Sequence, residues 1–127
     1  MHPHKKRILC VDDEETCLLI TSLLSPINFE VTTVQSVNEA LKKIESEKFD
    51  LYLLDNWLPG GSGVELCRRI RDEDAKTPII FYSGAAYDSD KQEAMAAGAQ
   101  VYLVKPRDIS LLVSSIRELL GLSSSPG

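Results

Sequence analysis

The sequence predicts an α/β protein built as one doubly wound, five-stranded parallel sheet with five helices. Short apolar runs, typical of strands buried on both faces, begin near residues 8, 30, 50, 79 and 101. Successive starts are therefore 22, 20, 29 and 22 residues apart, and each interval has room for one helix. Polar or charged side chains follow these runs, at the edge where a parallel sheet binds its ligands.

The first strand is predicted over residues 7–11, and a helix begins near Glu14. Proline disfavours helical geometry in the residue before it, so Ser25-Pro26 ends this helix. Residues 30–34 contain several β-branched side chains and form the second strand. Within the helix, apolar residues recur at helical spacing and form a core-facing stripe, namely Cys17, Ile20 and Leu24.

The second helix carries its own start signal. Ser36 and Glu39 form a capping box, in which the serine accepts a hydrogen bond from the backbone of Glu39 and the glutamate reaches back. Amphipathic spacing follows, at Val37, Ala40, Leu41 and Ile44. The central strand, residues 51–54, consists of four apolar residues that run without a polar break to a single carboxylate, Asp55.

The second half of the chain continues the alternation. A loop through Gly63 leads to a helix over roughly residues 64–71, and the fourth strand covers residues 78–82. Residues 88–97 are rich in alanine and charge, which predicts a helix with few core contacts, and Gly98 is its expected C-terminal cap.

The last strand, residues 101–104, precedes Asp108, the predicted N-cap of a strong amphipathic helix that Gly121 closes. Residues 5–121 are therefore expected to form one domain. Residues 122–127, which are rich in serine, are expected to form a tail or linker.

The composition excludes several classes of protein. A net charge of −5 argues against nucleic-acid binding by this domain. No apolar segment is long enough for a membrane span, and no signal-peptide core is present, so a cytoplasmic location is expected. The three cysteines lack C-x-x-C spacing and are odd in number, which argues against a disulfide framework.

Right-handed crossovers leave few topologies for such a chain. The expected one is flavodoxin-like, with strand order 2-1-3-4-5 and a cleft between strands 1 and 3. This order places Asp12, Asp13 and Asp55 side by side, and Ser83 and Lys105 reach the same edge from the fourth and fifth strands. Each residue alone would be ordinary at a strand end, but their joint placement indicates a site.

Three carboxylates in one cleft repel each other and require compensating charge. Lys105 supplies one positive charge, and Mg²⁺, which prefers oxygen ligands and keeps several waters, would supply the rest. No histidine or cysteine is placed for a zinc site. A phosphoryl group is the natural guest of such a cleft, with Asp55 as the carboxylate nucleophile and Ser83 as a hydrogen-bond donor to a phosphoryl oxygen.

These residues resemble those of a known family, the receiver domains of two-component response regulators. The resemblance covers about residues 5–121. It rests on several motifs taken together: Val11-Asp12-Asp13-Glu14, Leu53-Leu54-Asp55, Leu58-Pro59 with Gly63, Ser83-Gly84, Gly98-Ala99, and Tyr102-Leu103-Val104-Lys105-Pro106.

The resemblance implies that Asp55 accepts a phosphoryl group from a phosphohistidine on a histidine kinase or histidine phosphotransfer protein. Asp13, Asp55 and the carbonyl of Trp57 would bind Mg²⁺, or Mn²⁺ in its place, and Asp12 would act mostly through water. Ser83 and Tyr102 match the positions that rearrange on phosphorylation, with Lys105 contacting the phosphoryl group. The resemblance leaves open self-association or effector binding through residues 88–120.

Two departures from the family pattern concern the lifetime of the phosphate. Trp57 is bulky two residues past Asp55, and Ala85, two past Ser83, offers no polar group. We expect both to slow hydrolysis, by covering the phosphoryl group and by failing to orient water. Leu18 and Leu19 point away from the stripe of the first helix, and the resemblance implies that they dock the phosphodonor.

Two other functions are weighed against this switch. A receiver-like module that binds proteins without phosphate would have no reason to retain a repulsive carboxylate cluster. A small aspartyl phosphatase usually needs an acid two residues past the nucleophile, where this chain has Trp57. We therefore expect a phosphorylation-activated signalling switch that is not an enzyme beyond its own phosphorylation and dephosphorylation.

Overall fold

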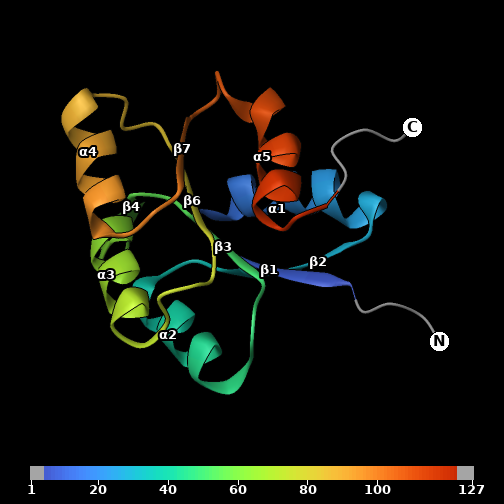
Figure 1. Ribbon diagram of the computed structural model, residues 1–127, viewed down its shortest axis with the longest axis horizontal. Helices are drawn as coiled ribbons and strands as arrows, with labels where there is room; N and C mark the ends of the chain where they lie inside the picture. Colours follow the sequence, from blue (N-terminus) through green and yellow to red (C-terminus); the bar gives the residue numbers. More distant parts are fainter. Residues whose placement is uncertain (1–4, 123–127) are drawn as a thin grey trace.

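The computed structural model describes residues 5–122 and shows one parallel sheet with helices on both faces (Figure 1). The five strands lie in the order β2-β1-β3-β6-β7, so the predicted flavodoxin-like order is confirmed. All neighbouring pairs are parallel. The strands are Lys6–Val11 (β1), Phe29–Val34 (β2), Leu51–Leu54 (β3), Ile79–Ser83 (β6) and Val101–Val104 (β7).

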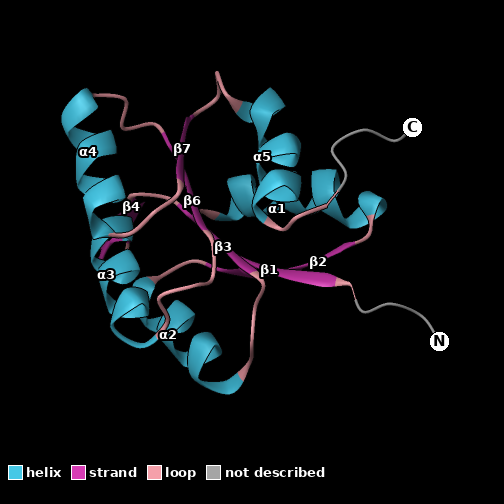
Figure 2. Cartoon of the chain, viewed as in Figure 1, coloured by secondary structure: helices cyan, strands magenta, loops and turns pink. Residues whose placement is uncertain are grey.

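Five α-helices cover the sheet, and α1 and α5 lie on the face opposite to α2, α3 and α4 (Figure 2). Alternate residues of a strand point to opposite faces, and β3 follows this rule. Leu51 and Leu53 pack in the cluster with α1 and α5, whereas Tyr52 and Leu54 pack in the other. The helices are Glu14–Leu24 (α1), Val37–Ser46 (α2), Gly63–Glu73 (α3), Asp88–Ala97 (α4) and Leu112–Leu119 (α5).

The segment between β3 and α3, predicted as a loop, contains a small hairpin. Residues Trp57–Leu58 (β4) pair antiparallel with Gly61–Ser62 (β5). Each strand has two residues, too few for a periodic pattern in the sequence. The hairpin fixes the start of α3, where Ser62 accepts a hydrogen bond from the backbone of Glu65 and caps the helix.

The prediction that Asp108 caps the last helix is wrong. Its carboxylate accepts a hydrogen bond from the backbone N–H of Val104 at 2.9 Å and pairs with Arg107 at 3.0 Å. The chain instead makes a 3₁₀ turn over Ile109–Leu111 (η2) before α5 begins. Aspartate is favoured both in turns and at caps, and here the turn that closes β7 takes its side chain.

The capping of α2 and α4 follows the sequence more closely. Ser36 Oγ accepts from the backbone N–H of Glu39 as predicted, but the Glu39 carboxylate accepts from the N–H of Gln35 rather than that of Ser36. Gly98 ends α4 with a φ of 119°, as expected of a C-terminal cap. At the end of α1 the chain continues through Pro26 as a 3₁₀ turn, Ser25–Ile27 (η1).

Three cysteines are buried and carry free thiols. Cys10 and Cys17 pack together between β1 and α1, with their sulfur atoms 3.9 Å apart. Cys67 lies on α3 and is buried on the other face of the sheet. Among the described residues, no helix is long and apolar enough to cross a membrane. Most of the expected tail, residues 123–127, lies outside the described part of the chain.

Candidate functional site

Three of the predicted charges meet at the carboxyl edge of the sheet. Asp12 follows β1, Asp55 follows β3, and Lys105 follows β7. The Lys105 ammonium donates to Asp12 Oδ1 at 2.8 Å and lies 3.6 Å from Asp55 Oδ2. The side chains of Asp12 and Asp55 are only 3% and 9% exposed, and within residues 5–122 Lys105 is the one cation that pairs with either carboxylate.

Lys105 only partly offsets the unfavourable burial of the Asp12 carboxylate and its repulsion by Asp55. Desolvation, with a further contribution from the charge of Asp55, outweighs the hydrogen bond from Lys105 and raises the pKa of Asp12 from 3.8 to about 6. For Lys105, burial acts to lower the pKa, but the hydrogen bond to Asp12 and the charges of both aspartates outweigh it and raise the pKa. The lysine is therefore firmly protonated, and the pair of carboxylates retains net negative charge.

Asp13 occupies a different position from its neighbour. Its side chain is exposed and caps α1, because Oδ1 accepts from the backbone N–H of Thr16 at 2.7 Å. This hydrogen bond lowers the pKa of Asp13. Within residues 5–122, no three His, Cys, Asp or Glu side chains stand close enough to hold a metal ion together. The three carboxylates that the sequence places side by side thus divide into a buried pair and an exposed cap.

The buried pair still has the donor set that magnesium prefers. Mg²⁺ binds through one or two carboxylates and keeps several waters, so it needs no cage of three protein side chains. Asp12 and Asp55 supply only oxygen, and the one ammonium that they share cannot neutralise both carboxylates. The residues present therefore fit a hard divalent cation.

Ser83, the last residue of β6, is fully buried, and its Oγ accepts from the backbone N–H of Ala85 at 3.2 Å. Ala85 is buried as well, and its carbonyl accepts from the Tyr102 hydroxyl at 2.6 Å. The Tyr102 ring stacks on Phe81, with centroids 5.6 Å apart. These contacts join the two predicted switch residues, Ser83 and Tyr102, through the loop that follows β6.

Trp57 lies beside the site but mostly in solvent, because 67% of its surface is exposed. A methyl group built at Gly84 would lie 3.7 Å from the indole, which places the ring against the loop that follows Ser83. Ring and loop thus form one border of the site. The role of the Trp57 carbonyl as a metal ligand stays a prediction.

Three further residues shape the site and were not predicted to do so. Thr16 Oγ1 lies 3.4 Å from the Lys105 ammonium, and Asn56 Oδ1 accepts from the backbone N–H of Val64. At Gly63 a Cβ atom would lie 2.2 Å from the carbonyl oxygen of Asp55, so only glycine fits. The sequence offered two signals, since Thr16 stands three residues after an aspartate at a helix start, and Gly63 belongs to a motif that carries the family resemblance.

The proposed docking leucines lie on the outer side of α1. Leu18 and Leu19 are 66% and 44% exposed, while the stripe of Cys17, Ile20 and Leu24 is buried as predicted. Leu23, at 37%, extends the exposed apolar surface. The orientation of these side chains agrees with the sequence, and their role in docking stays a prediction.

Comparison with known proteins agrees with this geometry. The family model described as "Response regulator receiver domain" matches residues 8–117. The chain is 36% identical over 115 residues to the alkaline phosphatase synthesis transcriptional regulatory protein PhoP of Bacillus subtilis, covering 87% of this chain and 48% of PhoP. The chain spans about half the length of the curated relatives that it matches.

Solved structures show the same fold. A two-component response regulator from Clostridium difficile superposes with a TM-score of 0.88 at 28% identity, covering 95% of this chain and all of that one. The response regulator TrrA of Thermotoga maritima, solved with Mg²⁺ and BeF, superposes with a TM-score of 0.80 at 34% identity, covering 90% of this chain and 98% of TrrA. With the family model matching residues 8–117 and the carboxylates and lysine at one sheet edge, this chain belongs to the response regulator receiver domain family.

Proposed function

We propose that Asp55 is the phosphoacceptor of this receiver domain. Phosphorylation-driven signalling is the general function of the family, and its members are not classed as enzymes. The observation that carries the assignment is the shared lysine, because Asp55 is buried at a strand end with an ammonium 3.6 Å away. Such a carboxylate can attack an electrophile whose developing charge the lysine stabilises.

The donor is a phosphohistidine on a histidine kinase or phosphotransfer protein. One oxygen of Asp55 attacks the phosphorus, and a P–O bond forms as the P–N bond breaks. The imidazole nitrogen leaves with the bonding electron pair and takes up a proton, while Asp55 carries the phosphoryl group as an acyl phosphate. Asp55 Oδ1 accepts from the backbone N–H of Asn56 at 2.8 Å, which orients the carboxylate for this attack.

Asp13, Asp55 and the carbonyl of Trp57 would hold Mg²⁺, and Asp12, the other member of the buried pair, would act mostly through water. Bound Mg²⁺ would offset charge on the transferring phosphoryl group. Asp13 can contribute Oδ2 while Oδ1 continues to cap α1. Mn²⁺, which also prefers oxygen ligands, is expected to substitute.

The switch is read out through Lys105, Ser83 and Tyr102. As the phosphoryl group arrives, the Lys105 ammonium moves from Asp12 toward a phosphoryl oxygen, and the Ser83 hydroxyl donates to another. Before phosphorylation, Ser83 Oγ accepts a hydrogen bond from the backbone N–H of Ala85, and the carbonyl of Ala85 accepts one from the Tyr102 hydroxyl. A change at Ser83 is therefore transmitted to the Tyr102 ring. We assign residues 88–120, which include α4 and α5, to self-association or effector contact, within a receiver domain of residues 5–121 followed by a tail at 122–127.

The phosphodonor docks on the exposed face of α1. Leu18 and Leu19 provide apolar surface near the site, because α1 begins directly after Asp13. Leu18→Asp or Leu19→Asp should slow transfer from the protein donor but not from acetyl phosphate. Equal slowing with both donors would contradict docking at this surface.

The phosphorylated form is expected to be long-lived. Trp57 borders the site, and the buried methyl of Ala85 cannot hydrogen-bond an attacking water. Trp57→Asn combined with Ala85→Glu should shorten the half-life of the acyl phosphate several-fold. An unchanged half-life in the double variant would show that these side chains do not set it.

Phosphoryl incorporation tests the central assignment. The chain is incubated with acetyl phosphate and Mg²⁺, and its mass is measured. We expect one phosphoryl group per chain, lost in Asp55→Asn and on chelation of the metal. Asp72→Asn, at an exposed carboxylate on α3, is the matched control and should be labelled fully. Full labelling of Asp55→Asn would refute the assignment.

A further inference from the structure

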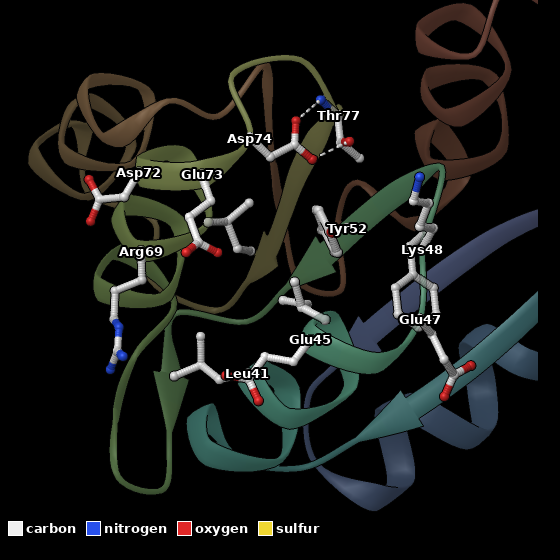
Figure 3. A pocket seen from close by; sticks show the side chains of 13 residues that line it. Leu41, Glu45, Glu47, Lys48, Tyr52, Arg69, Asp72, Glu73, Asp74 and Thr77 are labelled. Atoms are coloured by element: carbon white, nitrogen blue, oxygen red, sulfur yellow. Dashed lines mark hydrogen bonds between the residues drawn. The ribbon is translucent and has the colours of Figure 1, made fainter.

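A cavity of about 600 Å³ opens at the amino-terminal edge of the sheet, far from the carboxylates of the phosphorylation site (Figure 3). The C-terminal halves of α2 and α3 form its walls, and the loops that lead into β3 and β6 close its end. Its apolar surface comes from Leu41, Ile44, Phe49, Tyr52 and Ile70. A volume of this size lies within the range of small-molecule sites.

The cavity contains a polar group without a partner. Tyr52 is 4% exposed, and no hydrogen bond joins its hydroxyl to another residue within 5–122. Within that same part of the chain, no fully buried side-chain oxygen or nitrogen lacks a partner. The hydroxyl must therefore reach solvent, and the cavity that Tyr52 lines is its outlet. Burial and the charge of Asp74 raise the pKa of Tyr52, so the hydroxyl keeps its proton at neutral pH.

The rim of the cavity is acidic. It contains five carboxylates, Glu45, Glu47, Asp72, Glu73 and Asp74, against two cations, Lys48 and Arg69. Glu47 is paired with Arg7 and Lys43, and Asp74 is bonded to Thr77. Glu45 and Glu73, on opposite walls, have no ion-pair partner among residues 5–122.

Two further features favour a cation between these walls. In Figure 3 the Glu73 side chain extends toward the interior of the view, while Asp72 and Arg69 extend outward. Helices α2 and α3 both end at the cavity, and the C-terminal end of a helix carries partial negative charge. Side chains and backbone therefore contribute potential of the same sign.

We propose that this cavity binds an organic cation, an aromatic or branched apolar group that bears one ammonium or guanidinium. The apolar group packs against Ile44 and Ile70. The cation lies between Glu45 and Glu73, and the Tyr52 oxygen accepts one of its N–H groups. This site is separate from Asp55 and does not depend on its phosphorylation.

Three probes of one shape test the proposal. The chain is titrated with 4-phenylbutylamine, 4-phenylbutanol and 4-phenylbutyrate, and amide chemical shifts are recorded by NMR. The amine should bind saturably with a Kd of about 1 mM or tighter, shifting amides at residues 44–52 and 69–77. The alcohol should bind roughly fivefold more weakly and the acid should not saturate, because only the amine complements the rim.

Single substitutions separate the contribution of the carboxylate charges to binding from that of the Tyr52 hydroxyl. Glu45→Gln and Glu73→Gln should each weaken amine binding roughly threefold to fivefold without changing the affinity for the alcohol. Tyr52→Phe should keep the apolar contact and weaken only the amine. Glu93→Gln, at an exposed carboxylate on α4 outside the cavity, is the matched control and should leave the affinity unchanged.

The source of the cation is resolved by a second ligand, an end-blocked peptide that contains adjacent Phe and Arg. Tighter binding of the peptide than of the amine assigns the cation to a partner protein, and the reverse assigns it to a free amine; either supports the site. Equal affinity for the amine and the alcohol, or shifts that do not map to the lining residues, would overturn the proposal.

Discussion

At each of two opposite edges of the sheet, one cation is shared by two carboxylates. The two clusters differ in how the charges are satisfied, in part because Lys43 adds a second cation at the amino edge. At the amino edge, Arg7 binds Glu30 at 2.6 Å and Glu47 at 2.5 Å. At the carboxyl edge, Lys105 binds Asp12 at 2.8 Å and stands 3.6 Å from Asp55.

Geometry and burial account for the difference. The planar guanidinium of Arg7 offers separate N–H groups to its two glutamates, which remain in contact with solvent. The pKa of Glu47 is accordingly lowered, by Lys43 and then by Arg7. The ammonium of Lys105 is a compact charge shared between two buried carboxylates, and the pKa of Asp12 rises. The cluster with unmet charge is the one to which we assign the metal ion and the phosphoryl group.

The largest expected effect separates the two cations. Lys105→Ala should slow phosphorylation by acetyl phosphate roughly 100- to 1,000-fold, because the charge that stabilises the transferring group is lost. Arg7→Met should leave that rate unchanged, since Arg7 lies at the other edge. Intact-protein mass spectrometry measures the rate of phosphorylation of each variant. Similar rates in both variants would contradict the functional distinction between the clusters.

The second-largest expected effect is a loss of stability caused by a steric clash at the carboxyl edge. Gly63→Ala drives a methyl group toward the carbonyl oxygen of Asp55 and should destabilise the fold by about 3 kcal/mol. At Gly84 an added methyl meets only the edge of Trp57 at 3.7 Å, so Gly84→Ala should change stability by less than about 0.5 kcal/mol. Denaturant midpoints give both values, and equal effects would show that the contact at Gly63 relaxes freely.

The raised pKa of Asp12 predicts an unusual pH dependence. Because its folded pKa of about 6 exceeds the ordinary 3.8, the folded state binds more protons between these values, and this contribution to stability is lost as the pH rises. The stability of Asp12→Asn relative to the parent should therefore increase by about 2 kcal/mol from pH 4.5 to pH 7. A constant difference across this range would mean that Lys105 fully compensates Asp12.

The smallest effect concerns the amino edge. Arg7→Met removes two partly exposed ion pairs and a stacking contact with Phe49, and should destabilise the fold by about 1 kcal/mol. Added salt should reduce this difference, because exposed pairs are screened. Urea denaturation at two salt concentrations measures both quantities. A loss that salt does not change would assign the role of Arg7 to packing.

Much of the site could be predicted because it follows from periodicity. Apolar runs reveal the strands, and strand order brings Asp12, Asp55 and Lys105 to one edge without knowledge of any side-chain position. The buried stripe of α1 and the exposure of Leu18 follow from helical spacing in the same way.

Several features could not be predicted because they depend on individual contacts in the folded chain and leave no periodic pattern in the sequence. Asp13 and Asp108 are both plausible caps, but only Asp13 caps its helix, while Asp108 is taken by the turn after β7. The four-residue pairing of β4 with β5 has no periodic pattern. The need for glycine at position 63 arises because the chain folds back onto the carbonyl of Asp55, eight residues earlier, which no local pattern reveals. The cavity beside Tyr52 likewise depends on where two helices end.

The buried thiols on the two faces of the sheet make the motions of each layer separately measurable. A bulky thiol reagent reaches Cys17 only when α1 lifts from β1, and Cys67 only when α3 opens on the other side. Labelling rates of the single-cysteine variants therefore report local opening free energies for the two layers. Comparison of these rates before and after phosphorylation would show which layer loosens as the signal passes.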